Sequence, residues 1–399
     1  MNSSDFLIVG AGVVGLSVAR ELKNRYPDSK INIIEKEPDV AYHSSGRNSG
    51  VLHAGFYYSA DSLKAKFCRN GNKMLKEYCK ERKLSLNECG KVVVARNESE
   101  LVSLFELEKR GKKNGVDVSI IDTKQLSEFE PNAKTHQYAL YSPTTATVDP
   151  AEVNIAIKNE LIDKGINIFF NEEFKSKKEN NIVVTKKGTL FQAGVIINAA
   201  GLYADKIAKQ YGFSEKYTII PFKGIYLKYT NNDLPVKTNI YPVPNLKNPW
   251  LGVHFTYTVD NRVKIGPTAT PAFWRENYKG FAKFKGNEFI QILGWEALLF
   301  ITNAFYFRNI AIDEIKKYNR NYFVSLASEL VHSINKKGFT EWTKPGIRAQ
   351  LLNVNTKELV QDYVIESDKK TVHILNAVSP AFTSCFPFAE YIVDNYITK

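Results

Sequence analysis

The sequence DFLIVGAGVVG, residues 5–15, sets a short apolar run directly before Gly10, Gly12 and Gly15. Helical apolar spacing follows in LSVARELKNRY, and a second apolar run, KINIIEK, ends at Glu35–Lys36. The predicted order is therefore strand, glycine turn, helix and strand. The first glycine permits a tight turn, the second lets a pyrophosphate approach the backbone, and the third lets helix and strand pack closely. This unit predicts an α/β dinucleotide-binding fold in which the helix N-terminus faces the anion.

Glu35 narrows the choice of dinucleotide. It follows Gly15 by 20 residues and closes the second predicted strand, where a carboxylate accepts hydrogen bonds from ribose hydroxyls. The same charge would repel the 2′-phosphate of NADP. NAD and FAD remain the alternatives that this unit allows.

The next segment, HSSGRNSGVLHAGFYY (residues 43–58), favours FAD. In many FAD enzymes the chain after the ribose-binding acid turns back along the cofactor, and the small residues of 44–50 suit that path. Arg47 adds positive charge for the phosphates, while ordinary turn chemistry is the alternative for the hydroxyls and Asn48. Far downstream, GVIINAAGLYAD (residues 194–205) predicts a buried strand that returns to the cofactor's crevice.

Composition limits the partners. The chain has 399 residues, a formal charge of +12 and a pI near 9.2, which favours anionic partners such as acidic metabolites or anionic lipid. Lysines are scattered without a long basic run, so we expect no nucleic-acid partner. Four cysteines without CxxC pairing indicate a reducing compartment, and the polar N-terminus lacks the apolar core of a signal peptide. These features predict a cytoplasmic protein without a transmembrane helix or a metal site.

The rest of the chain predicts a second domain that interrupts the first. Alternating apolar and polar residues at 217–229 and 250–266 predict strands of an antiparallel sheet, and residues 281–334 have helical spacing. Residues 382–397 predict a closing helix. We therefore expect a discontinuous Rossmann-like FAD-binding domain and an α+β substrate-binding domain. The first comprises residues 1–88, 148–218 and 341–399, and the second comprises residues 89–147 and 219–340.

Several long blocks resemble the D-amino-acid-oxidase-type flavoproteins and, more narrowly, the L-2-hydroxyglutarate dehydrogenase/oxidase family. The blocks are HSSGRNSGVLHAGFYY, SLKAKFC, NIYPVPNLKNPWLGVHFT, IGPTA, GIRAQ and NAVSPAFTS, and they run over nearly the whole chain. The likeness ends at SCFPFAEYIV, which stands where the family is expected to have a run of small residues that includes glycine. The resemblance implies a bilobal fold of the two-dinucleotide-binding type and noncovalent FAD. It also implies oxidation of L-2-hydroxyglutarate to 2-oxoglutarate by hydride transfer from C2 to flavin N5, with electrons passed to a quinone or to oxygen.

The motifs and this resemblance together imply a set of FAD-binding residues. They are Gly10, Gly12, Val14, Gly15, Glu35, Lys36, Ser44, Ser45, Arg47, Asn48, Ser49, Gly50, Val51, Leu52, Phe174, Ala200, Gly201, Arg348, Ser379, Pro380, Ala381, Phe382 and Thr383. Within the set, Ser379–Ala381 is expected to begin the closing helix and to aim its N-terminus at flavin N1/O2. That arrangement would stabilise the anionic reduced ring.

Oxidation of a 2-hydroxy acid needs a cation for the carboxylate and a base for the hydroxyl proton. Arg348 in KPGIRAQ is the expected clamp, because a guanidinium meets a carboxylate with two parallel hydrogen bonds. His53 and His254 are the candidate bases, and the one that is not the base is expected to bind substrate. Tyr57 and Tyr241 are candidate donors to the substrate, with aromatic packing as the alternative. The histidines with weaker context are His43, His136, His332 and His373.

Residues 289–307, FIQILGWEALLFITNAFYF, are strongly apolar, yet Gln291, Glu296 and Asn303 argue against a spanning helix. A helix that lies on the inner face of the membrane would bury the apolar side chains and bring nearby basic residues to anionic lipid. A quinone acceptor would give such docking a purpose, whereas a core helix of the second domain is the alternative. The basic residues are Lys283, Lys285, Arg308, Lys316 and Lys317.

Two other functions fit the same features less fully. A flavoprotein for another small acid, such as an amino acid or glycerol 3-phosphate, would share the FAD site. A noncatalytic FAD- or NAD-binding protein of an assembly would share only the glycine motif. The expected convergence of Arg348, His53 and His254 favours an enzyme.

Overall fold

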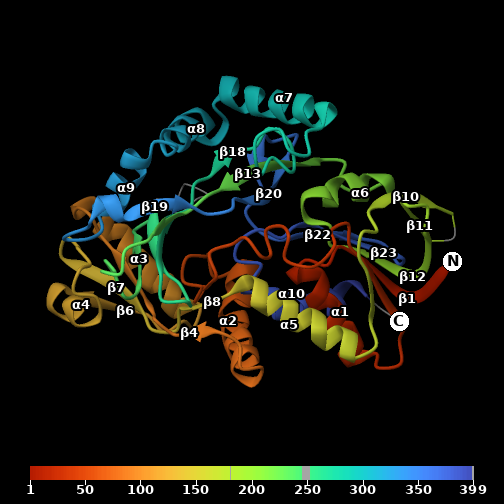
Figure 1. The fold of residues 1–399 in the computed structure, drawn as a ribbon, viewed down its shortest axis with the longest axis horizontal. Coiled ribbons are helices and arrows are strands. Elements are labelled where there is room, and N and C mark those ends of the chain that lie inside the picture. Colours follow the sequence, from red (N-terminus) through yellow and green to blue (C-terminus); the bar gives the residue numbers. More distant parts are fainter. Residues whose placement is uncertain (180, 245–251, 398–399) are drawn as a thin grey trace. The chain divides into compact units, whose positions relative to one another are not determined.

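Two compact units make up the chain, and the computed structural model describes residues 1–179, 181–244 and 252–397 (Figure 1). Residues 49–88, which we expected in the FAD-binding domain, belong to the second unit. The reason is strand pairing, since β3 (Val51–Leu52) and β4 (Leu86–Asn87) both pair with β8 (Ala146–Val148). The first unit comprises residues 1–48, 150–221 and 348–399, and the second comprises residues 49–149 and 222–347.

Parallel strands form the centre of the sheet in the first unit. β1 (Asn2–Val9) lies between β2 (Ile31–Ile34) and β12 (Leu190–Asn198), and both pairs are parallel. The parallel region continues through β9 (Asn167–Phe169) beside β2 and β23 (Thr371–Asn376) beside β12. The second half of β1 and all of β2 are buried, as is usual for parallel strands that are covered on both faces. The Rossmann-like fold predicted from the glycine motif is confirmed.

Antiparallel strands extend this sheet beyond β12 and β23. β10 (Phe174–Lys178) pairs with β11 (Ile182–Thr185), and β11 pairs with the first half of β12. β22 (Val364–Ser367) pairs with β23. A separate four-stranded sheet, in the order β18-β13-β20-β21, includes the short strand β21 (Glu358–Leu359), which pairs with the end of β20 (Gly346–Asn353).

Helix α1 (Val13–Arg25) packs against α5 (Pro150–Asp163) and against the closing helix α10 (Cys385–Tyr396). A 3-10 turn at Gly201–Tyr203 leads from β12 into α6 (Ala204–Gln210), which packs on β23. Among these helices, α1 connects the parallel strands β1 and β2, and α5 leads into the parallel strand β9.

The closing helix begins later than expected. It starts at Cys385, so Ser379–Ala381 lies in the turns before the helix and not in its first turn. Backbone hydrogen bonds to the carbonyls of Val378 and Pro380 close those turns. The unusual SCFPFAEYIV segment nevertheless packs well, because the ring of Phe388 stacks on Tyr363 with centroids 4.3 Å apart.

The second unit is organised on an eight-stranded sheet in the order β19-β14-β17-β16-β15-β5-β7-β6. We expected an antiparallel sheet, and one pair, β15 with β5, is parallel. Residues 91 and 239 begin these two strands, so no hairpin dictates opposite directions for them. Residues 250–251 of the predicted strand 250–266 lie outside the described residues. The strands are β5 (Lys91–Val94), β6 (Ser119–Asp122), β7 (Tyr138–Ser142), β14 (Leu227–Tyr229), β15 (Asn239–Pro242), β16 (His254–Tyr257), β17 (Val263–Gly266) and β19 (Phe339–Trp342).

Helices and short strands complete the second unit. The predicted helical region 281–334 forms three α-helices, which are separated at a 3-10 turn and at a tight turn. β18 (Thr270–Pro271) pairs with the end of β13 (Tyr217–Gly224), and a 3-10 turn occupies Lys336–Gly338. The helices are α2 (Leu63–Glu81), α3 (Glu98–Lys113), α4 (Thr123–Phe129), α7 (Gly286–Thr302), α8 (Phe307–Lys316) and α9 (Arg320–Ser328), with the 3-10 turn at Ala304–Tyr306.

The mixed sheet separates two apolar cores. Along β5, Val92 and Val94 belong to one core and Val93 to the other, because successive side chains of a strand alternate between its faces. The core with Val93 also contains Tyr241. Lys91 is two residues from Val93, so the strand places a lysine on the same face as this tyrosine.

Candidate active site

Two of the three motif glycines leave no room for a side chain. Gly10 has a φ of +108°, and a Cβ there would lie 2.6 Å from the carbonyl oxygen of Ala199. A Cβ on Gly15 would lie 2.1 Å from the carbonyl oxygen of Gly10. Gly12 is less crowded, since its Cβ would meet the Ser45 hydroxyl at 3.1 Å. The strand, the turn and α1 therefore pack as closely as a dinucleotide-binding motif requires.

Glu35 ties the end of β2 to the glycine turn. Its Oε2 accepts from the Ala11 N–H at 2.8 Å, and its Oε1 accepts from the Glu37 N–H at 3.0 Å. At the start of α1, the Val13 N–H donates to the Ser45 hydroxyl at 2.9 Å. A carboxylate oxygen can accept more than one hydrogen bond, so each oxygen of Glu35 keeps capacity for a ribose hydroxyl. Together with the narrow glycine turn, this acceptor fits the adenosine and pyrophosphate part of FAD.

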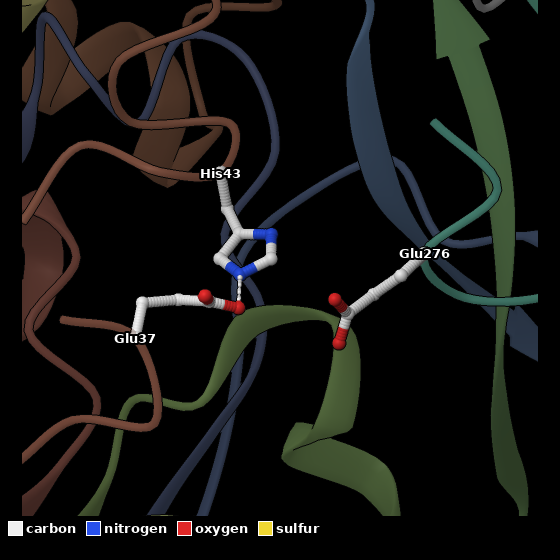
Figure 2. A group of neighbouring side chains, drawn as sticks. All are labelled: Glu37, His43 and Glu276. Carbon is white, nitrogen blue, oxygen red and sulfur yellow. Dashed lines mark hydrogen bonds and ion pairs between the residues drawn. The ribbon is translucent and has the colours of Figure 1, made fainter. Parts of the chain in front are cut away.

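The loop that follows β2 is held by its own polar side chains. The Asn48 amide donates to the carbonyls of Ser44 and Ser45, which is the turn chemistry considered above as an alternative. The Nε2 atom of His43 lies 3.0 Å from Oε1 of Glu37 (Figure 2). These bonds fix the path of the chain before it enters the second unit.

The remaining residues of the expected FAD set are divided between the units. Phe174 lies on β10 and packs against the apolar core of the first unit, while Gly201 opens the turn after β12 with a φ of +51°. Residues 379–383 precede α10, and Arg348 lies on β20, also in the first unit. Residues 49–52 belong to the second unit.

In the second unit, the predicted pair Tyr241 and His254 comes together on neighbouring strands. Ile240 of β15 pairs with Phe255 of β16, so their antiparallel register brings Tyr241 beside His254. The two rings stack with centroids 3.7 Å apart, and both side chains are buried. Nδ1 of His254 lies 2.8 Å from the Gly252 carbonyl oxygen, which can only accept a hydrogen bond. Nδ1 therefore carries a proton, and in the neutral form of the ring the lone pair is at Nε2.

His53 and Tyr57 belong to the same cluster. Burial lowers the pKa of His53 well below its ordinary value, and the nearby Lys91 and His254 lower it further. His53 is therefore a neutral imidazole at physiological pH. Burial also raises the pKa of Tyr57, whose hydroxyl has no hydrogen-bond partner among the described residues. The neutral imidazole of His53 can accept a proton, and the protonated phenol of Tyr57 can donate a hydrogen bond, within one buried site.

Lys91 is the member of this cluster that the sequence reasoning missed. Its side chain is fully buried, and Nζ lies over the rings of Tyr241 at 4.1 Å, Tyr57 at 5.2 Å and Phe56 at 5.6 Å. The signal in the sequence was a lysine that starts the buried run KVVV, at a position where alternation directs it to a core face.

The other histidines do not join this cluster. His136 is exposed and pairs with Glu98 at 3.0 Å, and His332 is exposed in a loop. His373 is buried in the first unit between Asn198 and Thr371, and burial lowers its pKa to about 4. Their weaker context in the sequence agrees with these placements.

The chain matches the model of the FAD dependent oxidoreductase family over residues 5–395. Because this match covers nearly the whole chain, the chain belongs to the FAD dependent oxidoreductase family, and its glycine turn and the acidic residue that ends β2 agree with that membership.

Within that class, the chain is similar to proteins named L-2-hydroxyglutarate dehydrogenase. It is 33% identical to that of Escherichia coli strain K12, over 99% of this chain and 93% of the relative. It is 32% identical to the human mitochondrial protein of that name, over 98% of this chain and 88% of the relative. The match is thus nearly full length in both directions.

Solved structures share the fold. The FAD-bound, dithionite-reduced L-α-glycerophosphate oxidase of Mycoplasma pneumoniae has a TM-score of 0.77 at 22% identity, covering 98% of this chain and 94% of that one. Glycine oxidase of Geobacillus kaustophilus has a TM-score of 0.71 at 17% identity, covering 99% and 94%. At such identities the likeness extends to the fold alone.

Proposed function

We propose that this chain oxidises L-2-hydroxyglutarate to 2-oxoglutarate with noncovalently bound FAD. The observation that carries the proposal is its identity of about one third, over nearly the full length, with proteins named L-2-hydroxyglutarate dehydrogenase. The buried cluster of His53, Tyr57, Tyr241 and His254 supports it, because it contains the proton acceptors that oxidation of an alcohol needs.

Each residue has a defined task in this reaction. His53 or His254 accepts the proton of the C2 hydroxyl, for which a neutral imidazole is the required form. Arg348 binds the C1 carboxylate with two parallel hydrogen bonds and so fixes the face of C2 that reacts. Tyr57 and Tyr241 remain protonated and donate hydrogen bonds to the substrate. FAD, when bound, supplies the acceptor for the two electrons that leave C2.

The glycine turn, Glu35 and Ser45 would hold the adenosine and pyrophosphate part of FAD. The close approach of strand and helix at Gly10 and Gly15 supports this assignment. Residues 44–52, Phe174, Ala200–Gly201 and 379–383 complete the proposed FAD site.

Anaerobic mixing with candidate substrates tests the function. The purified yellow protein is expected to lose flavin absorbance with L-2-hydroxyglutarate and to release 2-oxoglutarate. L-glutamate and glycerol 3-phosphate, the substrates of the rival function, are expected to leave the colour unchanged over the same time. Bleaching by either rival alone would overturn the substrate assignment, and acid release of NAD would overturn the cofactor assignment.

The electron acceptor is a separate proposal, and α7 and α8 are the observation behind it. Helix α7 exposes large apolar side chains: Ile290 and Ile301 are each 73% exposed, whereas Glu288 and Glu296 are buried on its inner face beside Ile292 and Leu299. Burial raises the pKa of Glu296 to about 8, so this carboxyl is neutral at physiological pH. Exposed apolar patches of this kind mark contact surfaces. Others exposed on these helices and their flanks are Phe281, Phe284, Leu293, Phe300, Tyr306, Ile312, Ile315 and Tyr318.

We propose that this surface rests on an anionic membrane and that the electrons pass to a quinone there. Within residues 1–179, 181–244 and 252–397, no single helix is long and apolar enough to span a bilayer, although α7 and residues 304–316 together form a bent pair that passes such a test. The alternative of a core helix fits the inner face of α7, where Ile292 and Leu299 are buried, but not the exposed Ile290 and Ile301. The basic residues contribute unequally, because Lys317 is buried against Glu314, whereas Arg308 is exposed.

A further inference from the structure

Lys91 is a buried ammonium group without a counter-charge. Its side chain has no exposed surface, and Nζ makes no hydrogen bond or ion pair with any described residue. Ammonium groups in such positions are rare, because burial of an unpaired charge costs several kcal/mol. A methionine would fill similar space without that cost. A lysine at this position therefore indicates a ligand that completes its environment.

The surroundings of Lys91 define the chemistry of that ligand. The rings of Phe56, Tyr57 and Tyr241 offer cation–π contact but no hydrogen-bond acceptor oriented to the ammonium. The thiols of Cys68 and Cys89 face it as well, and burial raises the pKa of both, so neither is an anion near neutral pH. The buried Tyr57 hydroxyl is a second donor without a partner among the described residues. Two unsatisfied donors on side chains whose ammonium and ring centroid are 5.2 Å apart suit an anion with two oxygens, which is a carboxylate.

The order of the strands places this receptor on the opposite side of Tyr241 from His254, one of the two candidate bases. β15 lies between β5 and β16, so Tyr241 has Lys91 on one side and His254 on the other. Nζ of Lys91 lies 4.1 Å from the ring centroid of Tyr241, and the ring centroids of Tyr241 and His254 are 3.7 Å apart. A substrate whose hydroxyl reaches His254 must extend along the tyrosine to reach Lys91. The C5 carboxylate of a five-carbon diacid extends in that way, whereas the C1 carboxylate is bonded to the reacting carbon.

We propose that Lys91, together with the hydroxyl of Tyr57, binds the C5 carboxylate of the substrate and sets the preference for a dicarboxylate. This inference rests on the proposed oxidation of L-2-hydroxyglutarate. A monocarboxylate of the same length leaves the ammonium buried and unpaired, and sites that desolvate a polar group discriminate strongly against ligands that cannot pair with it.

The same assignment predicts a pH dependence. Burial lowers the pKa of Lys91 to about 7, so the ammonium form that binds a carboxylate is lost as pH rises through about 7. The titratable groups that face it are Cys68, Cys89, His53, Tyr57 and Tyr241. Hence kcat/KM for a dicarboxylate should fall above about pH 7, while kcat/KM for a monocarboxylate should not share that limb.

The test compares L-2-hydroxyglutarate with L-2-hydroxyvalerate, which has the same carbon chain without the C5 carboxylate. Lys91→Met is expected to lower kcat/KM for the diacid on the order of 100-fold and to leave the monoacid unchanged or improved. Lys228→Met is the matched control, since Lys228 lies in the same sheet with an exposed ammonium that pairs with Glu341. It should retain the preference of the wild type.

Each outcome decides one of the two proposals. If wild type oxidises L-2-hydroxyglutarate and Lys91→Met keeps the full preference for it, the role of Lys91 is overturned. If wild type bleaches with neither hydroxy acid, the proposed function fails first. Should Lys91→Met not fold, the pH profiles of wild type with both substrates still decide, because identical alkaline limbs contradict a C5 receptor at Lys91.

Discussion

The glycine turn of the first unit and the cluster around Lys91 in the second unit hold their polar groups in opposite ways. In the first unit the groups of the glycine turn bond to one another, as Glu35 does to the N–H groups of Ala11 and Glu37. In the second unit the buried donors of Lys91 and Tyr57 have no partner among the described residues. The first unit thus has a preformed shape for a cofactor, whereas the second has unsatisfied donors for a substrate. Changes in the first should abolish FAD binding, and changes in the second should leave the yellow colour and alter turnover.

The largest effect is expected for Gly15→Ala. The new Cβ would lie 2.1 Å from the Gly10 carbonyl oxygen, so α1 and β1 must separate and the cradle for the pyrophosphate is lost. The variant should be recovered without FAD or not as folded protein, as measured by the ratio of flavin to protein absorbance. Gly294→Ala is the control, because no atom lies within 4 Å of its Cβ. A yellow, active Gly15→Ala protein would contradict the close packing of the turn.

His53→Ala and His254→Ala test the second unit at its reacting end. A general base typically contributes about a hundredfold to ten-thousandfold. At least one variant should lose flavin reduction by that order while it keeps FAD, measured by anaerobic stopped flow. Because the pKa of His53 is lowered, its neutral form persists below pH 6.5. If His53 is the base, the rate of flavin reduction should therefore fall only on the acid side of that value. Normal reduction in both variants would remove the pair from the proton step.

Arg348→Met tests the proposed carboxylate clamp, which lies at the start of the last segment of the first unit. Loss of a bidentate, charge-assisted contact should cost about 2–4 kcal/mol in kcat/KM for L-2-hydroxyglutarate. The colour should remain, because the glycine turn is untouched. An unchanged kcat/KM would mean that Arg348 has only a structural role in its strand. Loss of FAD from the variant would mean that Arg348 binds the cofactor and not the substrate.

Features formed by residues that are close together in the sequence could be predicted from it, whereas features formed by distant residues could not. The glycines, Glu35 and the loop after it lie within 50 consecutive residues, and each has a fixed spacing to the next, so the FAD-binding fold could be predicted. The cluster of the second unit comes from residues 53–57, 91, 241 and 254. Only strand pairing brings these segments together, and the sequence carries no spacing rule for it. Lys91 was missed for that reason, because its meaning depends on Tyr241, 150 residues away.

The predicted domain boundary and the predicted burial of the apolar helix were wrong or incomplete for a related physical reason. The segment 49–88 was assigned to the FAD-binding domain because it follows the loop directly, whereas pairing of β3 and β4 with β8 draws it into the second unit. Apolar spacing at 289–307 likewise indicated a helix but not which face would be buried. The two glutamates on α7 point inward, which a hydrophobicity pattern alone does not predict.

The smallest effect on turnover is expected at the surface of α7, where a change should alter location and not chemistry. Ile290→Glu with Ile301→Glu replaces two residues that are each 73% exposed, so folding and oxidation with a soluble acceptor should be unchanged. Flotation with anionic vesicles at low salt should show wild type in the lipid fraction and the double variant in the aqueous fraction. Each lost isoleucine removes roughly 1.5–3 kcal/mol of apolar burial, and salt should weaken the remaining attraction of the basic residues. Val102→Glu on α3, where the native side chain is 76% exposed, is the matched control and should float like wild type. If wild type stays in the aqueous fraction, the exposed face of α7 does not bind lipid, and the electrons must leave the flavin for oxygen or a soluble acceptor.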